Sequence, residues 1–180
     1  MKYIPLAMVR DHMEHIPFFP CPDGYRIRTF VEGDERHWAR IEMAAGEFSD
    51  QERALQRFAE HFGADPRGQR DRCFLLENQH GEAIGTASAW YGNFEEEERG
   101  RISWVGIVPA FQGKKLAKPL LSVVMARLAR DHQKVYLTTQ TTSYQAINLY
   151  LNFGFVPYPV RESCEEGWRL MEQVLQRKIL

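Results

Sequence analysis

The residues with the clearest chemical signature are Gln112, Gly113, Lys114 and Lys115, which follow a short apolar run over 105–108 and a proline. The apolar run has the composition of a buried strand, and the residues after the glycine have the pattern of an amphipathic helix. The first amide groups of a helix have no helical acceptor, so they can bind an anion. Neighbouring ammonium groups add positive charge, and the stretch therefore predicts a phosphate or pyrophosphate site. An ordinary helix start with solvated lysines stays open as the alternative.

The composition of the chain predicts one globular domain over residues 1–180. Its 180 residues are 44% hydrophobic and 12% aromatic, which is enough for a sizeable core. The 23 Lys and Arg residues against 24 Asp and Glu leave a net charge of −1, so no nucleic-acid partner is expected. Arg10 and Asp11 interrupt the N-terminus too early for a secretory core, and no apolar run is long enough to span a membrane. We therefore expect a cytoplasmic protein without a membrane partner.

The cysteines and histidines do not predict a metal site. Cys21, Cys73 and Cys164 are odd in number, far apart and outside any C-x-x-C arrangement, which indicates reduced structural thiols. His12 and His15 could share a helical face, but no nearby cluster completes a ligand set. We expect no metal.

Hydrophobic periodicity predicts alternating strands and helices behind an N-terminal arm. The four prolines of residues 1–24 indicate an extended arm, residues 25–160 the core, and residues 161–180 a C-terminal helix. The charge run over 95–99 is interpreted as a solvated turn. Strands are predicted over 25–30, 73–78, 83–91, 101–108, 135–140 and 155–160, the last at a sheet edge because of its prolines, and helices over 35–48, 49–62, 116–128, 143–153 and 165–178.

Two segments together resemble the main motifs of the GCN5-related N-acetyltransferases. They are Ile107–Ala117 and Ser143–Phe155, and two motifs at the right separation are far more specific than either alone. The order of elements along 25–160 is also similar to that of the family. The resemblance implies an α/β fold with a mixed, mostly antiparallel sheet, splayed between two parallel strands and flanked by helices. It also implies transfer of an acetyl group from acetyl-CoA to a primary amine.

The resemblance also implies which residues bind the co-substrate. The family's Q/R-x-x-G-x-G/A loop falls on residues 112–117, whose backbone amides should hold the CoA pyrophosphate, and main-chain groups of 107 and 108 would pair with the pantetheine. Lys115 replaces the usual glycine, so either its amide approaches the phosphate without needing the conformational freedom of glycine, or binding is weakened; a helical φ is open to lysine. Ser143 replaces a frequent asparagine and should still cap the following helix. The implied cofactor-binding residues are Ile107, Val108, Gln112, Gly113, Lys114, Lys115, Leu116, Ala117, Ser143 and Tyr150.

Two residues are candidates for the chemistry itself. Tyr150 matches the family's tyrosine near the thioester sulfur, where a hydrogen bond would stabilise the developing thiolate; a core tyrosine on an amphipathic helix is the alternative. Family members often use a glutamate on the strand before the loop as the base. The predicted strand 101–108 carries no carboxylate, so Glu98 is the nearest upstream candidate. A threonine at 138, 139 or 141, or a bound water, could relay the proton instead.

The leading hypothesis is therefore an acetyl-CoA-dependent N-acetyltransferase that acetylates the amine of a small molecule, peptide or protein by direct attack on the thioester. A non-catalytic acyl-CoA-binding or sensing module is the alternative, because Lys115 replaces the glycine and the strand carboxylate is missing. A nucleotide hydrolase is disfavoured, because the loop lacks the Gly-Lys-Ser/Thr end that binds magnesium. Trp90, Tyr91 and Phe94 lie beside four glutamates and favour a cationic acceptor. The edge strands and the last helix are compatible with a homodimer.

Overall fold

The structure, a computed structural model, describes residues 1–159 and 162–180 and divides into two units of chain. The first unit comprises residues 1–17, 91–101 and 131–180, and the second comprises residues 18–90 and 102–130. Val160, the expected end of the strand predicted over 155–160, and Arg161, the expected start of the C-terminal segment, lie outside the described residues.

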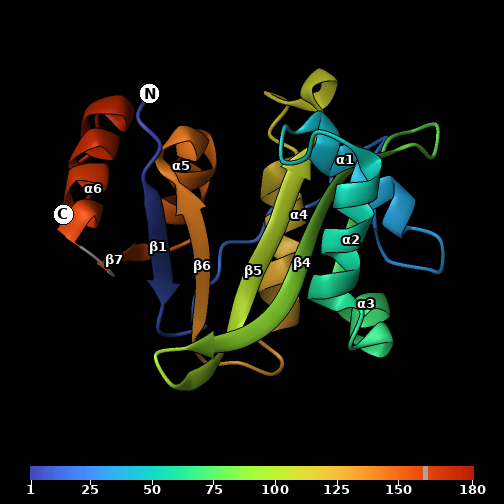
Figure 1. Ribbon diagram of the computed structural model, residues 1–180, viewed down its shortest axis with the longest axis horizontal. Coiled ribbons are helices and arrows are strands. Elements are labelled where there is room, and N and C mark those ends of the chain that lie inside the picture. Colours follow the sequence, from blue (N-terminus) through green and yellow to red (C-terminus); the bar gives the residue numbers. More distant parts are fainter. Residues whose placement is uncertain (160–161) are drawn as a thin grey trace. The chain divides into compact units, whose positions relative to one another are not determined.

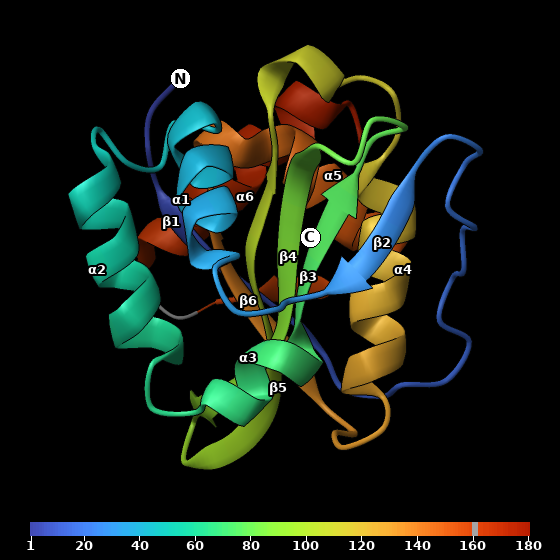
Figure 2. The ribbon, with the colours of Figure 1, turned by 90° about the vertical axis from the view of Figure 1, so that its right-hand side faces the viewer.

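The strands form a seven-stranded mixed sheet with the order β2-β3-β4-β5-β6-β1-β7. Figure 1 labels β4, β5, β6, β1 and β7, and Figure 2 labels β2 and β3. Strands β5 and β6 pair in parallel, whereas β1 pairs antiparallel with both β6 and β7, and β3 with both β2 and β4. The predicted mixed α/β sheet and the edge position of the last strand are confirmed. The strands are β1 Pro5–Arg10, β2 Arg26–Thr29, β3 Cys73–Glu77, β4 Ala83–Phe94, β5 Glu97–Ile107, β6 Val135–Gln140 and β7 Val156–Tyr158.

Helices cover the strands of each unit. In the second unit α1 and α2 lie on one side of β3 and β4, and α4 lies on the opposite side (Figure 2). In the first unit α6 contacts both β1 and α5. The helices are α1 Glu35–Ala44, α2 Gln51–Phe62, α3 Pro66–Arg72, α4 Ala117–Leu128, α5 Tyr144–Asn152 and α6 Glu162–Leu175, with 3₁₀ turns η1 Pro109–Phe111 and η2 Thr141–Ser143.

The N-terminal segment is not only an arm, because it contains β1 between β6 and β7. The strand is buried along its last five residues, and Met8 is fully buried. The later part of the segment does extend along α4 within the second unit, where the Phe19 N–H donates to Ser122 Oγ at 2.9 Å. Because the partner strands of β1 are distant in the sequence, the local pattern of prolines concealed it.

Aromatic packing joins α1 to α2 in the second unit. Trp38 of α1 is 1% exposed, and its ring centroid lies 5.2 Å from that of Phe58 and 6.3 Å from that of Phe62, both on α2. Helix α2 is capped by Asp50, whose side chain accepts from the Arg53 N–H at 2.9 Å. The two helices predicted over 35–48 and 49–62 are therefore confirmed, and α1 ends earlier than expected, at Ala44.

A two-residue turn connects β4 and β5. Glu95 and Glu96 have φ values of 51° and 64°, and such a pair of left-handed residues is typical of a type I′ hairpin turn. Both are exposed, so the solvated turn is confirmed at its tip, whereas residues 97–99 already belong to β5.

Candidate functional site

Two side chains of the loop between β5 and α4 attach its two ends to the rest of the second unit. Gln112 Nε2 donates to the Ile107 carbonyl oxygen at 2.8 Å, which ties the loop back to the end of β5. Leu116, at the N-cap position of α4, is 2% exposed and anchors the other end in the core. The loop backbone between these two contacts is therefore held in one conformation, although residues 112–115 are themselves exposed.

The loop backbone contains two left-handed residues, and the second of them is followed by a right-handed residue. The φ values are +77° at Gly113, +62° at Lys115 and −70° at Leu116. The helical φ considered for Lys115 is not the one that it adopts. Lysine occupies the left-handed region that glycine favours, at a cost of roughly 1–2 kcal/mol. A left-handed and right-handed pair of this kind turns successive amide groups toward one side and forms an anion-binding concavity.

The amide groups of residues 113–117 are donors without an acceptor. Within the part of the chain that the structure describes, none of these five N–H groups has a hydrogen-bond partner, whereas Gln112 N–H donates to the Pro109 oxygen and Lys118 N–H to the Lys115 oxygen. They stand at the start of a 12-residue helix, whose dipole also favours an anion. The residues present therefore fit a phosphate or pyrophosphate group.

Two of the three lysines near the loop rest on aromatic rings. Lys114 Nζ lies 4.6 Å from the centroid of Phe111, and Lys118 Nζ lies 4.9 Å from that of Phe19. These contacts hold positive charge beside the loop without neutralising it. Lys115 is exposed.

The backbone amides of Ile107 and Val108, at the end of β5, differ in whether they are free to bind a ligand. The Val108 N–H donates to the Ile84 oxygen on β4 at 2.9 Å, so it is already used within the sheet. Because successive residues of a strand direct their N–H groups to opposite sides, the Ile107 N–H points to the edge of β5 away from β4. Of the two amides expected to face a ligand, the geometry favours that of Ile107.

Tyr150 belongs to α5 and Ser143 immediately precedes this helix; both lie in the first unit, whereas the loop belongs to the second. Tyr150 is 6% exposed, and its ring packs edge-on against Phe155 at 6.1 Å. The end of its helix is fixed by Arg10, which donates to the Phe153 carbonyl oxygen. Ser143 occupies the N-cap position, but its hydroxyl makes no cap bond and instead accepts from Gln140 Nε2 at 2.8 Å. The expectation that Ser143 caps the helix is wrong.

Glu98 lies on β5, because this strand begins at Glu97 and not at Arg101. The premise that the strand lacks a carboxylate is therefore wrong. Glu98 is exposed in the first unit, and its neighbour Glu97 pairs with Lys134 Nζ at 3.0 Å. Among the threonines considered as relays, Thr141 is buried and structural, since its hydroxyl accepts from the Ile4 N–H and donates to the Lys2 oxygen.

The sequence interpretation missed Glu42, a carboxyl group on α1 that is 1% exposed. Its Oε1 has no hydrogen-bond partner among the described residues. Burial, with a smaller contribution from the charge of Glu47, raises the pKa of Glu42 to about 8. The carboxyl lies against Gly106 of β5, where a Cβ atom would come within 2.9 Å of Oε1. Glu42 follows Trp38 by four residues and so shares its buried helical face, a signal that was present in the sequence.

An aromatic cluster lies on the same stretch of β5 that Glu42 contacts, where the strand is irregular. Trp104 has a φ of +54°, which is an outlier for a bulky residue and typical of a bulge. Its ring contacts Trp38 at 5.2 Å, Phe48 at 5.6 Å and His61 at 6.0 Å. The adjacent Ser103 Oγ also lies 3.4 Å from His61 Nε2, so consecutive side chains of β5 face the same side. The bulge thus places two side chains toward α1 and α2.

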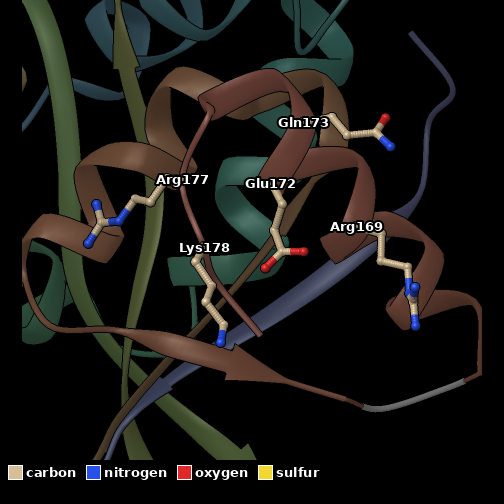
Figure 3. Close-up of a pocket in the computed structure, with 5 residues that line it drawn as sticks. All are labelled: Arg169, Glu172, Gln173, Arg177 and Lys178. Atoms are coloured by element: carbon tan, nitrogen blue, oxygen red, sulfur yellow. The ribbon is translucent and has the colours of Figure 1, made fainter.

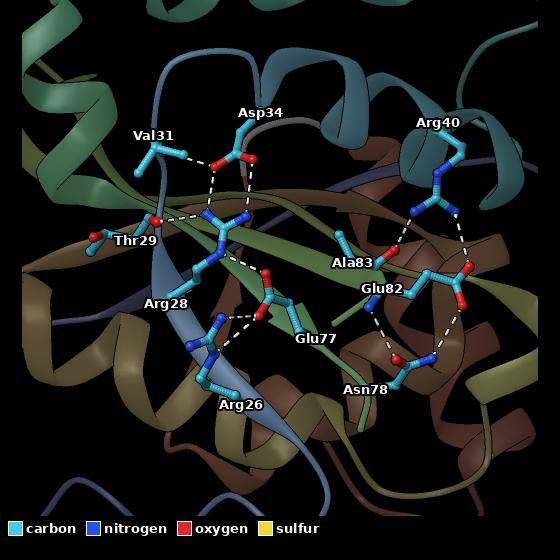
Figure 4. A network of polar contacts seen from close by, with 10 residues as sticks. All are labelled: Arg26, Arg28, Thr29, Val31, Asp34, Arg40, Glu77, Asn78, Glu82 and Ala83. Atoms are coloured by element: carbon cyan, nitrogen blue, oxygen red, sulfur yellow. Dashed lines mark hydrogen bonds and ion pairs between the residues drawn. The ribbon is translucent and has the colours of Figure 1, made fainter. Parts of the chain in front are cut away.

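Charged side chains fix α1 over the sheet (Figure 4). Arg28 of β2 donates to Asp34 at the start of α1, at 2.6 and 3.0 Å, and to Glu77 of β3 at 2.6 Å. Burial alone would raise the pKa of Asp34, but the hydrogen bonds from Arg28 and from a backbone amide outweigh it and lower that pKa. Arg40, further along α1, donates to the Ala83 oxygen. The helix that carries Glu42 is therefore anchored at two points.

A hollow on α6 contains none of the predicted site residues (Figure 3). Two of its polar side chains already have partners within the protein. Glu172 accepts from the Ile179 and Leu180 amides at 2.7 and 3.0 Å, and Arg177 donates to Asn152 at 2.8 Å. We assign it no binding role. Its lining residues are Arg169, Glu172, Gln173, Arg177 and Lys178.

Residues 34–155, which include the loop, Glu42 and Tyr150, match the Acetyltransferase (GNAT) family. The chain belongs to this family. It is 30% identical over 149 residues to the mycothiol acetyltransferase of Streptomyces griseus, covering 77% of this chain and 45% of that protein. It is 31% identical over 166 residues to that of Acidothermus cellulolyticus, covering 83% of this chain and 50% of the relative. The GNAT chain thus spans about half the length of these curated relatives.

The fold also matches solved GNAT structures. The GCN5-related N-acetyltransferase from Sphaerobacter thermophilus superposes with a TM-score of 0.66 at 24% identity, over 86% of this chain and 48% of that chain. In the described ranges, none of the helices combines the length and apolar character that crossing a membrane requires.

Proposed function

We propose that this GNAT chain is an acetyl-CoA-dependent N-acetyltransferase that moves an acetyl group to a primary amine. The observation that carries the proposal is the run of five amide donors at 113–117, left without an acceptor in the described chain at the start of α4. A pyrophosphate would meet several donors together with positive charge from nearby lysines. The loop is assigned to the CoA pyrophosphate, and Lys115 contributes an ammonium group at its rim.

The remaining residues would act on the thioester and the amine. The Ile107 N–H, directed away from β4, is the proposed donor to the pantetheine or the thioester carbonyl. The Tyr150 hydroxyl would stabilise the developing thiolate by a hydrogen bond. An alkylammonium with a pKa of about 10.4 must lose a proton before attack, at a cost of about 5 kcal/mol at pH 7. A proton acceptor is therefore a necessary part of the site, and the exposed Glu98 stays a candidate for it.

The acceptor is proposed only as a class. The relatives named mycothiol acetyltransferases are about twice as long as the aligned region. Their acceptor is therefore only one of the amines to be tested as a substrate. The predicted cationic acceptor stays a prediction, and so does the homodimer. Phe94, one of the aromatics on which that prediction rested, has the Arg99 guanidinium 5.2 Å from its ring centroid and so already has a cation beside it.

A CoA-release assay over a panel of amines at pH 8 tests the proposal, together with calorimetric binding of CoA. We expect release with at least one primary amine and none with a matched tertiary amine, which cannot give a stable amide. Binding of CoA without release for any acceptor would instead establish the acyl-CoA-binding module. Absence of CoA binding would refute both functions.

A further inference from the structure

We propose that Glu42 is the group that receives the proton of the acceptor's ammonium group, and this inference rests on the proposed function. It is distinct from the proton acceptors and relays that the sequence offered, because it lies on α1 and not on β5, β6 or η2.

The first argument is that the carboxyl is buried while its Oε1 has no hydrogen-bond partner in residues 1–159 and 162–180. Buried polar atoms in proteins are nearly always hydrogen-bonded, and a carboxyl group that is 1% exposed with an unpartnered oxygen needs an explanation. An exposed glutamate such as Glu47 does not have this cost of burial. An oxygen kept in this way is available to a polar ligand.

Two neighbouring polar atoms are in the same situation. The indole Nε1 atoms of Trp38 and Trp104 are buried and have no acceptor among the residues that the structure describes. The two rings pack at 5.2 Å, and Trp38 lies one helical turn before Glu42. One acceptor and two donors therefore lack partners in the same part of the second unit. Orphaned polar atoms gathered in this way indicate a place for a polar molecule.

The geometry of β5 gives the carboxyl its position. Gly106 has no Cβ, and a Cβ there would lie 2.9 Å from Glu42 Oε1, so the glycine leaves the space that the carboxyl occupies. The next residue, Ile107, carries the amide that points away from β4. The carboxyl thus contacts the strand one residue from the proposed thioester donor. The half-buried Trp104 lies two residues before Gly106 on the same strand, and its ring contacts Trp38 and the half-buried Phe48. Aromatic rings next to a carboxylate suit a primary ammonium.

The proton balance is as follows. The ionised carboxylate of Glu42 takes one proton from R–NH₃⁺, and the neutral amine attacks the thioester carbon. The C–N bond forms, the C–S bond breaks, and the second proton that the nitrogen loses goes to the departing sulfur to give CoA–SH. Glu42 then releases its proton to water. The pKa of an alkylammonium exceeds that of an ordinary glutamate by about 6 units, but exceeds the value of about 8 at Glu42 by only about 2. Proton transfer is correspondingly easier.

The charged and titratable groups around Glu42 define its expected pH dependence. Burial is the larger effect on its pKa, and the charge of Glu47, three residues after the end of α1, adds to it. From α2, His61 reaches the neighbouring Trp104 and Ser103. On α1, Arg40 is committed to the Ala83 oxygen and to Glu82. The facing part of β5 contributes Ser103, Trp104 and Gly106, which do not titrate in the neutral range.

The test is the pH profile of kcat/KM for CoA release, measured with the best amine of the panel for the wild type, Glu42→Gln, Glu47→Gln and the exposed α2 control Glu52→Gln. For the wild type we expect kcat/KM to rise with pH along an acid limb with a midpoint near 8. Glu42→Gln should lose about 10²–10⁴-fold in rate and should no longer show this limb. In Glu47→Gln the limb should move to lower pH. Glu52→Gln should match the wild type. Infrared difference spectra should show a protonated carboxyl that titrates with the same midpoint and is absent in Glu42→Gln.

The possible failures are distinguishable. Absence of turnover by the wild type with every amine would remove the proposed function and this inference together. Turnover with an unchanged rate and pH profile in Glu42→Gln would overturn the inference alone. A Glu42→Gln variant that is slower but keeps the acid limb would also overturn it, because that result indicates only a packing role.

Discussion

The pH dependence of folding should carry a direct signature of Glu42. The unfolded chain releases this proton at the ordinary pKa of 4.5, whereas the folded protein holds it up to about 8. Between these values the folded state binds one more proton, so the free energy of unfolding decreases as the pH rises, by about 1.4 kcal/mol per unit. The loss begins near pH 4.5 and is complete above pH 8. It amounts to about 5 kcal/mol, comparable with the whole stability of many domains.

Urea unfolding followed by tryptophan fluorescence between pH 5 and 9 measures this effect. Glu42→Gln resembles the protonated carboxyl, so its advantage over the wild type should be near zero at pH 5 and grow to several kcal/mol at pH 8. Glu47→Gln should end the decline at a lower pH, because it removes the charge that adds to burial. If the wild type and Glu42→Gln gave parallel curves across this range, the reasoning about the buried carboxyl would be refuted.

Three further changes test the rest of the site. Lys115→Gly should raise the free energy of unfolding by about 1 kcal/mol relative to Lys115→Ala, because only glycine relieves the left-handed φ. Calorimetric titration of both variants with CoA then tests the ammonium group. If that group binds CoA, both variants should lose the same amount of CoA affinity. Tyr150→Phe should keep CoA affinity and lower kcat by about 10²-fold, as expected for loss of one donor to a developing charge, and an unchanged kcat in steady-state kinetics would assign Tyr150 to the core. Asp34→Asn should cost about 2 kcal/mol in denaturant unfolding at pH 7, and this cost should vanish as the pH falls through the lowered pKa of Asp34, whereas a constant cost would contradict the ion-pair account.

Local patterns were sufficient for elements with strong periodicity. The strand over 135–140 and the helices that follow Asp50 and Leu116 agree with the structure closely, because their apolar residues recur at the spacing of the element. Strand β1 was missed, since its burial depends on pairing with strands far away in the sequence. Helix α3 was missed because it is polar, and the Asp65 side chain that caps it was its main signal.

The candidate site was predictable in composition but not in conformation. The loop sequence identified the amide donors, yet the left-handed φ of Lys115 depends on how Gln112 and Leu116 fasten the two ends. Glu42 escaped notice because a glutamate on an amphipathic helix is usually solvated. Its burial depends on Gly106, a glycine within a distant strand, and such a glycine often marks a place where another group approaches closely.

The contact between Gln112 and the Ile107 oxygen also bears on the entropy of binding. A loop that becomes ordered only around its ligand loses conformational freedom at the moment of association, and the affinity decreases accordingly. Here the side chain of Gln112 and the burial of Leu116 set the backbone before any anion arrives. The free-energy cost of the strained φ at Lys115 is likewise part of folding and not of binding. An anion that enters this loop therefore binds to a preorganised site, and the cost of ordering the loop lowers the free energy of unfolding instead of the affinity.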